Sequence, residues 1–230
     1  MAQYRRIKVY NTILEQGLVP LFYHQDLPTA RQIVAAVQGG GGNIVEFTNR
    51  GDSAFEVFSK LAQEVALSAS GKSAFPGMIL GVGSVLDAPT AALFVAAGAN
   101  FIVGPAFNPE VARLCNRRKI AYLPGCGTVS EISAAEEAGV EIVKLFPGES
   151  VGGPGFVKAV LGPLPWANLL PTGGVDATEE SIQKWFKAGV CAVGMGSNLV
   201  TKDFVAAGNF QGISERTAHV LAWIRAARAA

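Results

Sequence analysis

One lysine, Lys144, lies within the apolar segment Glu141-Ile142-Val143-Lys144-Leu145-Phe146. If this segment is a strand, side chains alternate between its two faces, and Lys144 lies opposite Val143 and Leu145. Burial of an ammonium group is costly and favours the neutral amine, which is a nucleophile. The pattern therefore predicts a reactive amine. A structural lysine that reaches solvent at the strand end, or that pairs with Glu46, is the alternative.

A carboxylate and a guanidinium occur together in the segment Val45-Glu46-Phe47-Thr48-Asn49-Arg50. Strand alternation places Glu46, Thr48 and Arg50 on one face. Beside a reactive amine, a carboxylate can transfer protons, and an arginine can bind a substrate carboxylate through two hydrogen bonds. Taken alone, such a pair would more often be a structural ion pair. Lys144 at the end of another strand favours a catalytic role for both residues.

Glycine-rich segments follow two later predicted strands, Thr172-Gly173-Gly174 and Gly194-Met195-Gly196-Ser197. Glycine allows the backbone to approach a ligand closely, and unblocked backbone N–H groups bind phosphate. Each segment alone is equally typical of a tight turn. Because barrels usually bind phosphate at the loops after their last two strands, the two segments together predict a phosphate-binding end of the site.

The elements that must position these residues are short apolar segments that alternate with stretches of helical spacing. Eight segments have the uniformly apolar character of parallel strands buried on both faces: Leu18–Tyr23, Asn43–Asn49, Met78–Val85, Phe101–Ala106, Ala121–Cys126, Ile142–Gly148, Asn168–Val175 and Cys191–Asn198. The helical stretches between them are Leu27–Gln38, Ser53–Ser70, Ala88–Ala97, Pro109–Arg117, Thr128–Ala138, Gly155–Leu161 and Thr178–Ala188. This order predicts an α/β fold, a (β/α)8 TIM barrel formed by residues 1–230 as a single domain. A doubly wound open sheet would more often have about five or six strands.

Two further helices are expected outside the repeat. Tyr4–Gln16 would close the bottom of the barrel, and Ser214–Ala229 would pack an apolar stripe against it, opposite three arginines. The stripe consists of Val220, Leu221 and Ile224, and the arginines are Arg216, Arg225 and Arg228. Gly98, Gly139 and Gly189 follow alanine-containing stretches, where they are expected to end helices.

The composition excludes several classes of protein. With 50% hydrophobic and 16% charged residues, the chain can bury a large core. A formal net charge of +1 provides no overall field for binding nucleic acid or an anionic membrane. No apolar run reaches the roughly 20 residues that a bilayer requires, and the first residues lack the pattern of a signal peptide. A cytoplasmic protein is expected.

Cysteine and histidine provide no pattern for a metal site. Cys115, Cys126 and Cys191 are widely spaced and are expected to be core thiols in a reducing compartment. His24 and His219 are the two histidines, and neither has other ligands at metal-binding spacing. His24 follows the first predicted strand and is a candidate for lining the mouth of the barrel.

With these residues in place, the chain resembles the class I aldolase family that cleaves 2-keto-3-deoxy-6-phosphogluconate and 4-hydroxy-2-oxoglutarate. The similar stretches occur in the family's order over about residues 17 to 205: Val45-Glu46-Phe47-Thr48-Asn49-Arg50, Gly81-Val82-Gly83-Ser84-Val85, Leu123-Pro124-Gly125-Cys126-Gly127-Thr128-Val129-Ser130-Glu131, Val143-Lys144-Leu145-Phe146-Pro147-Gly148-Glu149, Pro171-Thr172-Gly173-Gly174 and Gly196-Ser197. The resemblance implies a (β/α)8 barrel that needs no metal or other cofactor and forms a homotrimer.

The resemblance also implies a role for each site residue. Lys144 would form the Schiff base, Glu46 would be the acid/base, and Arg50 and Ser84 would hold the carboxylate of a small 2-keto acid. The other substrate-binding positions would be Pro147 and, at the distal phosphate end, Thr172, Gly173, Gly174, Gly196 and Ser197. The products would be pyruvate and an aldehyde, either glyceraldehyde 3-phosphate or glyoxylate.

Departures from the family's pattern concern the choice of substrate. Many members have an arginine after the first strand, where this chain has Tyr23-His24, and Ser84 stands where threonine is common. The run Gly39-Gly40-Gly41-Gly42 and the segment beyond Phe204 also differ from shorter members. Two alternatives remain: a phosphate-binding isomerase or epimerase, which would not need a buried lysine, and a non-catalytic barrel that binds a sugar acid.

Overall fold

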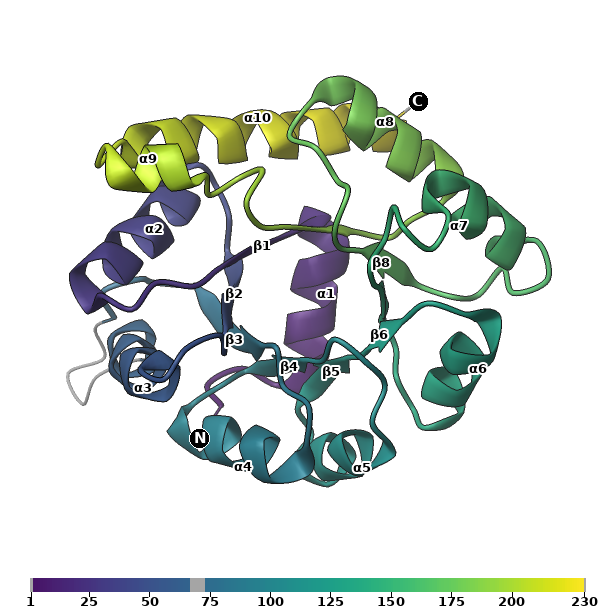
Figure 1. Ribbon diagram of the computed structural model, residues 1–230, viewed down its shortest axis with the longest axis horizontal. Helices are drawn as coiled ribbons and strands as arrows, with labels where there is room; N and C mark the ends of the chain where they lie inside the picture. The colour runs from purple at the N-terminus through teal and green to yellow at the C-terminus, as the bar shows by residue number, and fades with distance from the viewer. Residues whose placement is uncertain (1, 67–72, 230) are drawn as a thin grey trace.

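Short parallel strands, each buried along its whole length, form the centre of the molecule in the computed structural model, which describes residues 2–66 and 73–229 (Figure 1). Their bounds are β1 Leu18–Phe22, β2 Ile44–Thr48, β3 Ile79–Gly83, β4 Phe101–Val103, β5 Ala121–Leu123, β6 Gly125–Cys126, β7 Val143–Leu145, β8 Leu169–Pro171 and β9 Val193–Met195. Each of the eight predicted segments contains a strand that is shorter than expected. The uniformly apolar sequence of these strands matches burial on both faces.

The strands form a curled parallel sheet in two hydrogen-bonded parts rather than one closed eight-stranded ladder. One part has the order β5-β4-β3-β2-β1-β9, and the other has the order β6-β7-β8. Pro124 separates β5 from β6 because proline has no N–H to donate to a neighbouring strand. At the other junction, an isolated bridge joins Thr172 to Gly194. The alternating β/α order is confirmed, and the structure shows ladder breaks at these two places.

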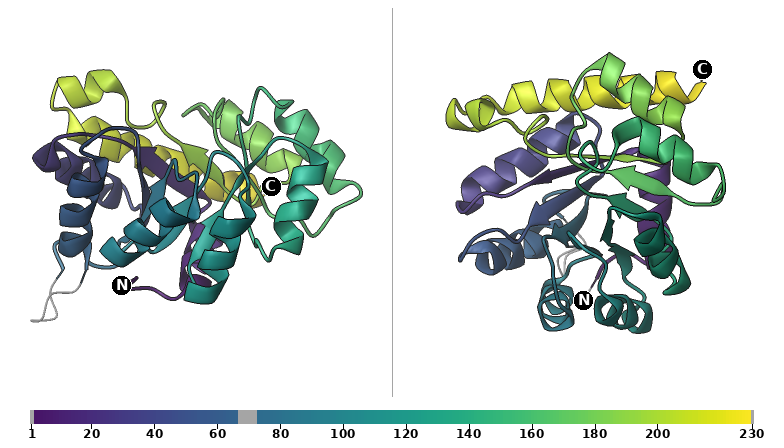
Figure 2. Two further views of the ribbon diagram at one scale, coloured as in Figure 1. Left: turned by 60° about the horizontal axis from the view of Figure 1, so that its bottom comes forward. Right: turned by 45° about the vertical axis from the view of Figure 1, so that its right-hand side comes forward.

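Helices surround the sheet (Figures 1 and 2). Their bounds are α1 Arg6–Gln16, α2 Leu27–Gly39, α3 Ala54–Val65, α4 Ala88–Ala97, α5 Pro109–Arg118, α6 Val129–Glu137, α7 Gly153–Leu161, α8 Glu179–Ala188, α9 Lys202–Ala206 and α10 Phe210–Ala229. The last part of the helix predicted at Ser53–Ser70 lies outside the described residues. Gly98, Gly139 and Gly189 have positive φ angles, as expected for residues that end helices. The five-residue helix α9 was not predicted.

Side-chain caps explain where many helices begin. Asp26, Asp87, Asn108 and Thr178 accept hydrogen bonds from the first-turn N–H groups of α2, α4, α5 and α8, respectively. Each of these residues is extended at the N-cap, which is the geometry that favours Asp, Asn, Ser and Thr there. These caps therefore fix the residues at which the four helices begin.

Helix α1 closes the end of the sheet opposite the carboxyl ends of the strands, as the sequence predicted (Figure 1). Val9, Tyr10 and Ile13 of α1 are buried in an inner cluster with strand side chains such as Ile44 and Phe101. The Tyr10 hydroxyl accepts a hydrogen bond from the N–H of Tyr122, 3.2 Å away. The inside of the sheet is therefore filled at this end and open at the other.

Helix α10 packs between α8 and α2 and occupies the remaining outer position. Val220, Leu221 and Ile224 are buried, which confirms the predicted apolar stripe. The expectation that the arginines lie opposite this stripe is only partly correct: Arg225 and Arg228 are exposed, but Arg216 and Arg228 each lie four residues from a stripe residue and donate to backbone carbonyls near β9. Their long apolar stems allow these side chains to reach back from the helix surface. None of the described helices is both long and apolar enough to span a membrane.

Candidate active site

Lys144 of β7 and Glu46 of β2 both lie inside the sheet. Their exposed fractions are 5% and 3%. Both strands are buried on both faces, and alternation places the two side chains on the inner face, because Ile44 and Ile142, two residues earlier, belong to the inner cluster. The Lys144 amine lies 4.8 Å from the centre of the Phe146 ring. Within the described chain, ion pairs occur on the outer helices, and none joins Lys144 to Glu46. The structure therefore contains a buried amine and a buried carboxyl group that do not form an ion pair with each other.

Burial moves the pKa values of these two groups toward each other. It raises the pKa of Glu46, while the positive charges of Lys144 and Arg50 act in the opposite direction. Burial lowers the pKa of Lys144, the Glu46 charge opposes this shift, and the Arg50 charge adds to it. Both shifts favour the neutral forms. An amine that can lose its proton and a carboxyl group that can hold one are the groups that nucleophilic attack with proton transfer requires.

Glycine residues on the inner face make room for the polar groups. A Cβ atom at Gly83 would lie 1.7 Å from Oε1 of Glu46, and one at Gly194 would lie 2.2 Å from Oγ1 of Thr172. Sequence reasoning identified Gly83 only as part of a strand end and missed its relation to Glu46. The available signal was a glycine inside a strand, which often marks a close approach.

Arg50 and Ser84 meet where β2 and β3 end. Nε of Arg50 donates a hydrogen bond to Oγ of Ser84 over 3.1 Å. Ser84 has a φ angle of 61°, in the left-handed region that residues other than glycine seldom adopt. The exposed Arg50 and the strained Ser84 thus present a cation and a hydroxyl group at the rim, which can bind a carboxylate.

A cavity of about 220 Å³ opens at the carboxyl ends of the strands. Six predicted site residues line it: Arg50, Thr172, Gly173, Gly174, Gly196 and Ser197. The remaining wall residues are Leu21, Phe146, Val175, Gly194 and Asn198. Pro147 lies beside Gly173, because a Cβ atom at Gly173 would be 3.9 Å from it. The structure thus brings together residues from the ends of four predicted strands. Lys144, Glu46 and Ser84 are not part of this wall, but Phe146, whose ring is close to the Lys144 amine, is part of it.

The glycine-rich loops at the distal end of this cavity present unused backbone donors. In the described part of the chain, the N–H groups of Gly173, Gly174, Gly196 and Ser197 have no hydrogen-bond acceptor. The carbonyl of Gly196 accepts from the N–H groups of both Leu199 and Val200, which closes a single helical turn. Free N–H groups at such a turn are suited to bind an anion.

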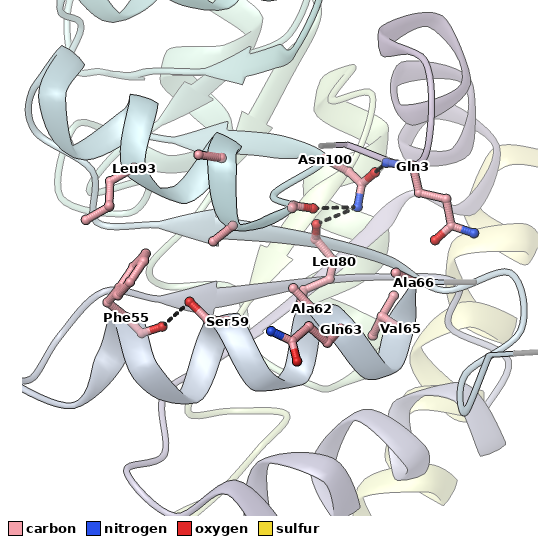
Figure 3. Close-up of a pocket in the computed structure, with 13 residues that line it drawn as sticks. Gln3, Phe55, Ser59, Ala62, Gln63, Val65, Ala66, Leu80, Leu93 and Asn100 are labelled. Atoms are coloured by element: carbon pink, nitrogen blue, oxygen red, sulfur yellow. Dashed lines mark hydrogen bonds between the residues drawn. The ribbon is translucent and has the colours of Figure 1, made fainter. Parts of the chain in front are cut away.

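A larger cavity, of about 540 Å³, lies between α3 and α4, away from the strand ends (Figure 3). Phe55, Ser59 and Leu93 line it with Asn100 and several alanines, and no titratable side chain is among its wall residues. The side chain of Asn100 donates to the carbonyls of Leu80 and Gly98. Its one hydroxyl group, that of Ser59, donates to the carbonyl of Phe55, and no base among the wall residues could activate it. The smaller cavity at the strand ends, which six of the predicted site residues line, is the candidate active site.

His24 is not among the residues that line the candidate site, although the sequence made it a candidate. Its Nδ1 atom lies 3.1 Å from the backbone N–H of Asp26, in the loop before α2. Within residues 2–66 and 73–229, no three His, Cys, Asp or Glu side chains are grouped as metal ligands.

The comparisons with known proteins agree with one another. The family described as KDPG and KHG aldolase matches residues 9–216. The chain is 32% identical to a 2-dehydro-3-deoxy-phosphogluconate aldolase of Pseudoalteromonas atlantica, over 88% of this chain and 89% of that protein. It is 30% identical to the KHG/KDPG aldolase of Escherichia coli K12, over 89% of this chain and 91% of that protein.

A solved structure provides a comparison of folds. The KDPG aldolase of Legionella pneumophila, captured with pyruvate as a covalent carbinolamine intermediate, is 26% identical and has a TM-score of 0.80. The match covers 91% of this chain and 96% of that one.

Proposed function

We propose that this chain, which belongs to the KDPG and KHG aldolase family, is a class I aldolase that cleaves a 4-hydroxy-2-keto acid to pyruvate and an aldehyde. The candidate substrates are 2-keto-3-deoxy-6-phosphogluconate and 4-hydroxy-2-oxoglutarate, which would release glyceraldehyde 3-phosphate and glyoxylate, respectively. The observation that carries this proposal is the buried amine of Lys144 with a lowered pKa, inside the same sheet as the buried Glu46.

The first step of the proposed mechanism joins the substrate to the protein. The neutral amine of Lys144 attacks the C2 ketone, and the resulting carbinolamine loses water to form a protonated imine. Arg50 and Ser84, which are hydrogen-bonded to each other at the rim, hold the substrate carboxylate. The raised pKa of Glu46 allows this group to donate the proton that leaves with the water.

The second step breaks the carbon–carbon bond. Glu46, now ionised, accepts the proton of the C4 hydroxyl, and the electrons of the C3–C4 bond move to the imine. The aldehyde leaves and an enamine remains on Lys144. Glu46 then returns the proton to C3, and hydrolysis of the imine releases pyruvate. The protonated imine provides the electron sink, so no metal or other cofactor is required in this mechanism.

The distal loops would bind the far end of the substrate. The free N–H groups of Gly173, Gly174, Gly196 and Ser197 support binding of a phosphate or of a second carboxylate. Thr172 lies at the base of these loops, with its hydroxyl packed toward Gly194. Pro147 borders the same end, beside Gly173.

Borohydride reduction in the presence of pyruvate tests this proposal. We expect a reduced pyruvyl adduct on the peptide that contains Lys144, and none in a Lys144→Ala variant. A folded wild-type protein that forms no adduct would refute the imine mechanism. Assays with both substrates then identify the aldehyde partner.

We also propose that residues 1–230 form a single domain whose strands close a (β/α)8 barrel, with β5 and β6 as one interrupted strand. The bridge between Thr172 and Gly194 supports closure on the other side.

A homotrimer is proposed from the family resemblance. The outer helix α4 carries no charged residue and exposes Leu93, which supports association. Sedimentation should then give a mass of three times the 24.0 kDa of one chain.

We propose a cytoplasmic location, which the free thiols of the cysteines in the described chain support.

A further inference from the structure

Helix α10 holds strand β9 from both ends. Nη2 of Arg228 donates to the carbonyl of Cys191, before β9 begins, over 2.6 Å. Nη1 of Arg216 donates to the carbonyl of Asn198, after β9 has ended, over 3.1 Å. The two arginines are on the same helix, but only Arg216 contacts the loop that lines the cavity.

The guanidinium of Arg216 is positioned by more than this hydrogen bond. It stacks on the ring of Phe204 in α9, with 4.6 Å between its central carbon and the ring centre. Within the described chain it pairs with no carboxylate. Its charge is therefore not neutralised by an acidic partner, and the hydrogen bond that it donates goes to the Asn198 carbonyl.

Asn198 connects this arginine to both distal loops. Its side-chain Nδ2 donates to the carbonyl of Val175 over 3.0 Å and to Oδ1 of Asp176 over 2.9 Å. Its backbone follows Gly196 and Ser197, whose N–H groups are free. A change in the position of Asn198 would thus move the loops after β8 and β9 together.

We infer that Arg216 is a positioning residue that sets the geometry of the distal anion-binding loops and so favours substrates with an anionic far end. This inference rests on the proposed function of the site. Arg216 itself does not line the cavity and acts through the Asn198 carbonyl. Its positive charge beside the turn adds to the attraction that the free N–H groups exert on an anion.

The test compares Arg216→Met with two matched variants from the same helix. Arg228→Met removes the bond at the start of β9 together with a second one, from Nη1 to the carbonyl of Glu15, and Arg225→Met removes an exposed arginine. Each protein is assayed for kcat and KM with 2-keto-3-deoxy-6-phosphogluconate and with 4-hydroxy-2-oxoglutarate. Inorganic phosphate serves as a competitive inhibitor, and thermal unfolding and the Lys144 adduct report on the intact fold and amine.

For Arg216→Met we expect the KM for the phosphorylated substrate and the inhibition constant for phosphate to rise about tenfold, the effect of roughly one charge-assisted hydrogen bond. The KM for 4-hydroxy-2-oxoglutarate, whose far end is a smaller and less charged carboxylate, should rise less than about threefold. Arg216→Lys, which keeps the charge, should recover part of the loss. Arg228→Met should lower thermal stability without changing the ratio of the two KM values.

An unchanged ratio of KM values in Arg216→Met would overturn the inference, and so would an equal change in Arg228→Met. Failure of the proposed function gives a different result, because wild-type protein would then form no pyruvate adduct. In that case direct titration with phosphate still compares the wild type with Arg216→Met. A wild type that neither binds phosphate nor cleaves the phosphorylated substrate would also overturn the inference.

Discussion

The space that Gly83 leaves for Glu46 predicts the effect of adding one methyl group. In Gly83→Ala the new Cβ atom would lie 1.7 Å from Oε1 and 2.4 Å from Cδ of Glu46. The nearest atoms belong to one flexible side chain, so Glu46 can rotate away while the backbone stays in place. The carboxyl group would then lose its position beside the reacting carbons. We expect kcat to fall by roughly 10²-fold, the lower end of the contribution of one acid/base group.

Gly81→Ala is the matched control for this substitution, on the same strand and the same face. Its Cβ atom would lie 2.4 Å from the ring of the buried Phe101 and would not meet Glu46 first. Overpacking of this kind typically costs about 1–3 kcal/mol of stability. We therefore expect Gly81→Ala to lower the melting temperature more than Gly83→Ala, and to lower kcat less.

The assay combines steady-state cleavage, thermal unfolding and trapping of the pyruvate imine. Gly83→Ala should still form the Lys144 adduct, because the amine is unchanged. The double variant Gly83→Ala, Glu46→Gln should be little slower than Glu46→Gln alone, since both changes act on one group. A folded Gly83→Ala enzyme with kcat within about twofold of the wild type would refute the reasoning, since acid/base catalysis should lose far more.

Three further predictions concern the same site. Lys144→Ala should abolish turnover in the cleavage assay, and retained activity would contradict the imine mechanism. The pH at which imine formation reaches half its maximum should shift down in Glu46→Gln, because the lost negative charge had raised the pKa of Lys144. It should shift up in Arg50→Met, because the lost positive charge had lowered the pKa of Lys144. Trapping rates measured across pH would show both shifts, and shifts in the same direction would be inconsistent with this charge arrangement. Arg50→Ala should raise KM and leave kcat closer to normal if the arginine binds ground state and transition state alike, whereas a loss confined to kcat would assign it to the transition state.

The residues of the site that sequence could predict are those controlled by strand alternation. Lys144 and Glu46 are single charged residues within uniformly apolar strands, so their burial followed from the strand composition, and their place on the inner face followed from the period of two. The convergence of Arg50 with Gly173 and Ser197 followed from the parallel order of the strands, whose carboxyl ends share one edge.

Other features depend on contacts that sequence spacing does not encode. Helical spacing sets Arg216 and Arg228 four residues from Val220 and Ile224, beside the apolar stripe and not opposite it as expected, but it does not identify the carbonyls on either side of β9 that they reach. The relation of Gly83 to Glu46 requires the register between β2 and β3, in which Thr48 is paired with Gly83. The break between β5 and β6 depends on which strand neighbours Pro124. Helix α9 has five residues, too few for an apolar period to be recognised.

The position of α1 has a consequence for synthesis on the ribosome. Tyr10 bonds to Tyr122, which is 112 residues later in the chain. At about 5–20 residues per second, roughly 6 to 22 seconds pass between the synthesis of the two residues. During that time the strands that bury Val9, Tyr10 and Ile13 are added one after another, and the inner cluster stays incomplete until residues such as Leu170 and Ala192 have followed. Docking of α1 is therefore a late, non-local event in folding, and the nascent helix is an apolar surface that a chaperone at the ribosome can bind.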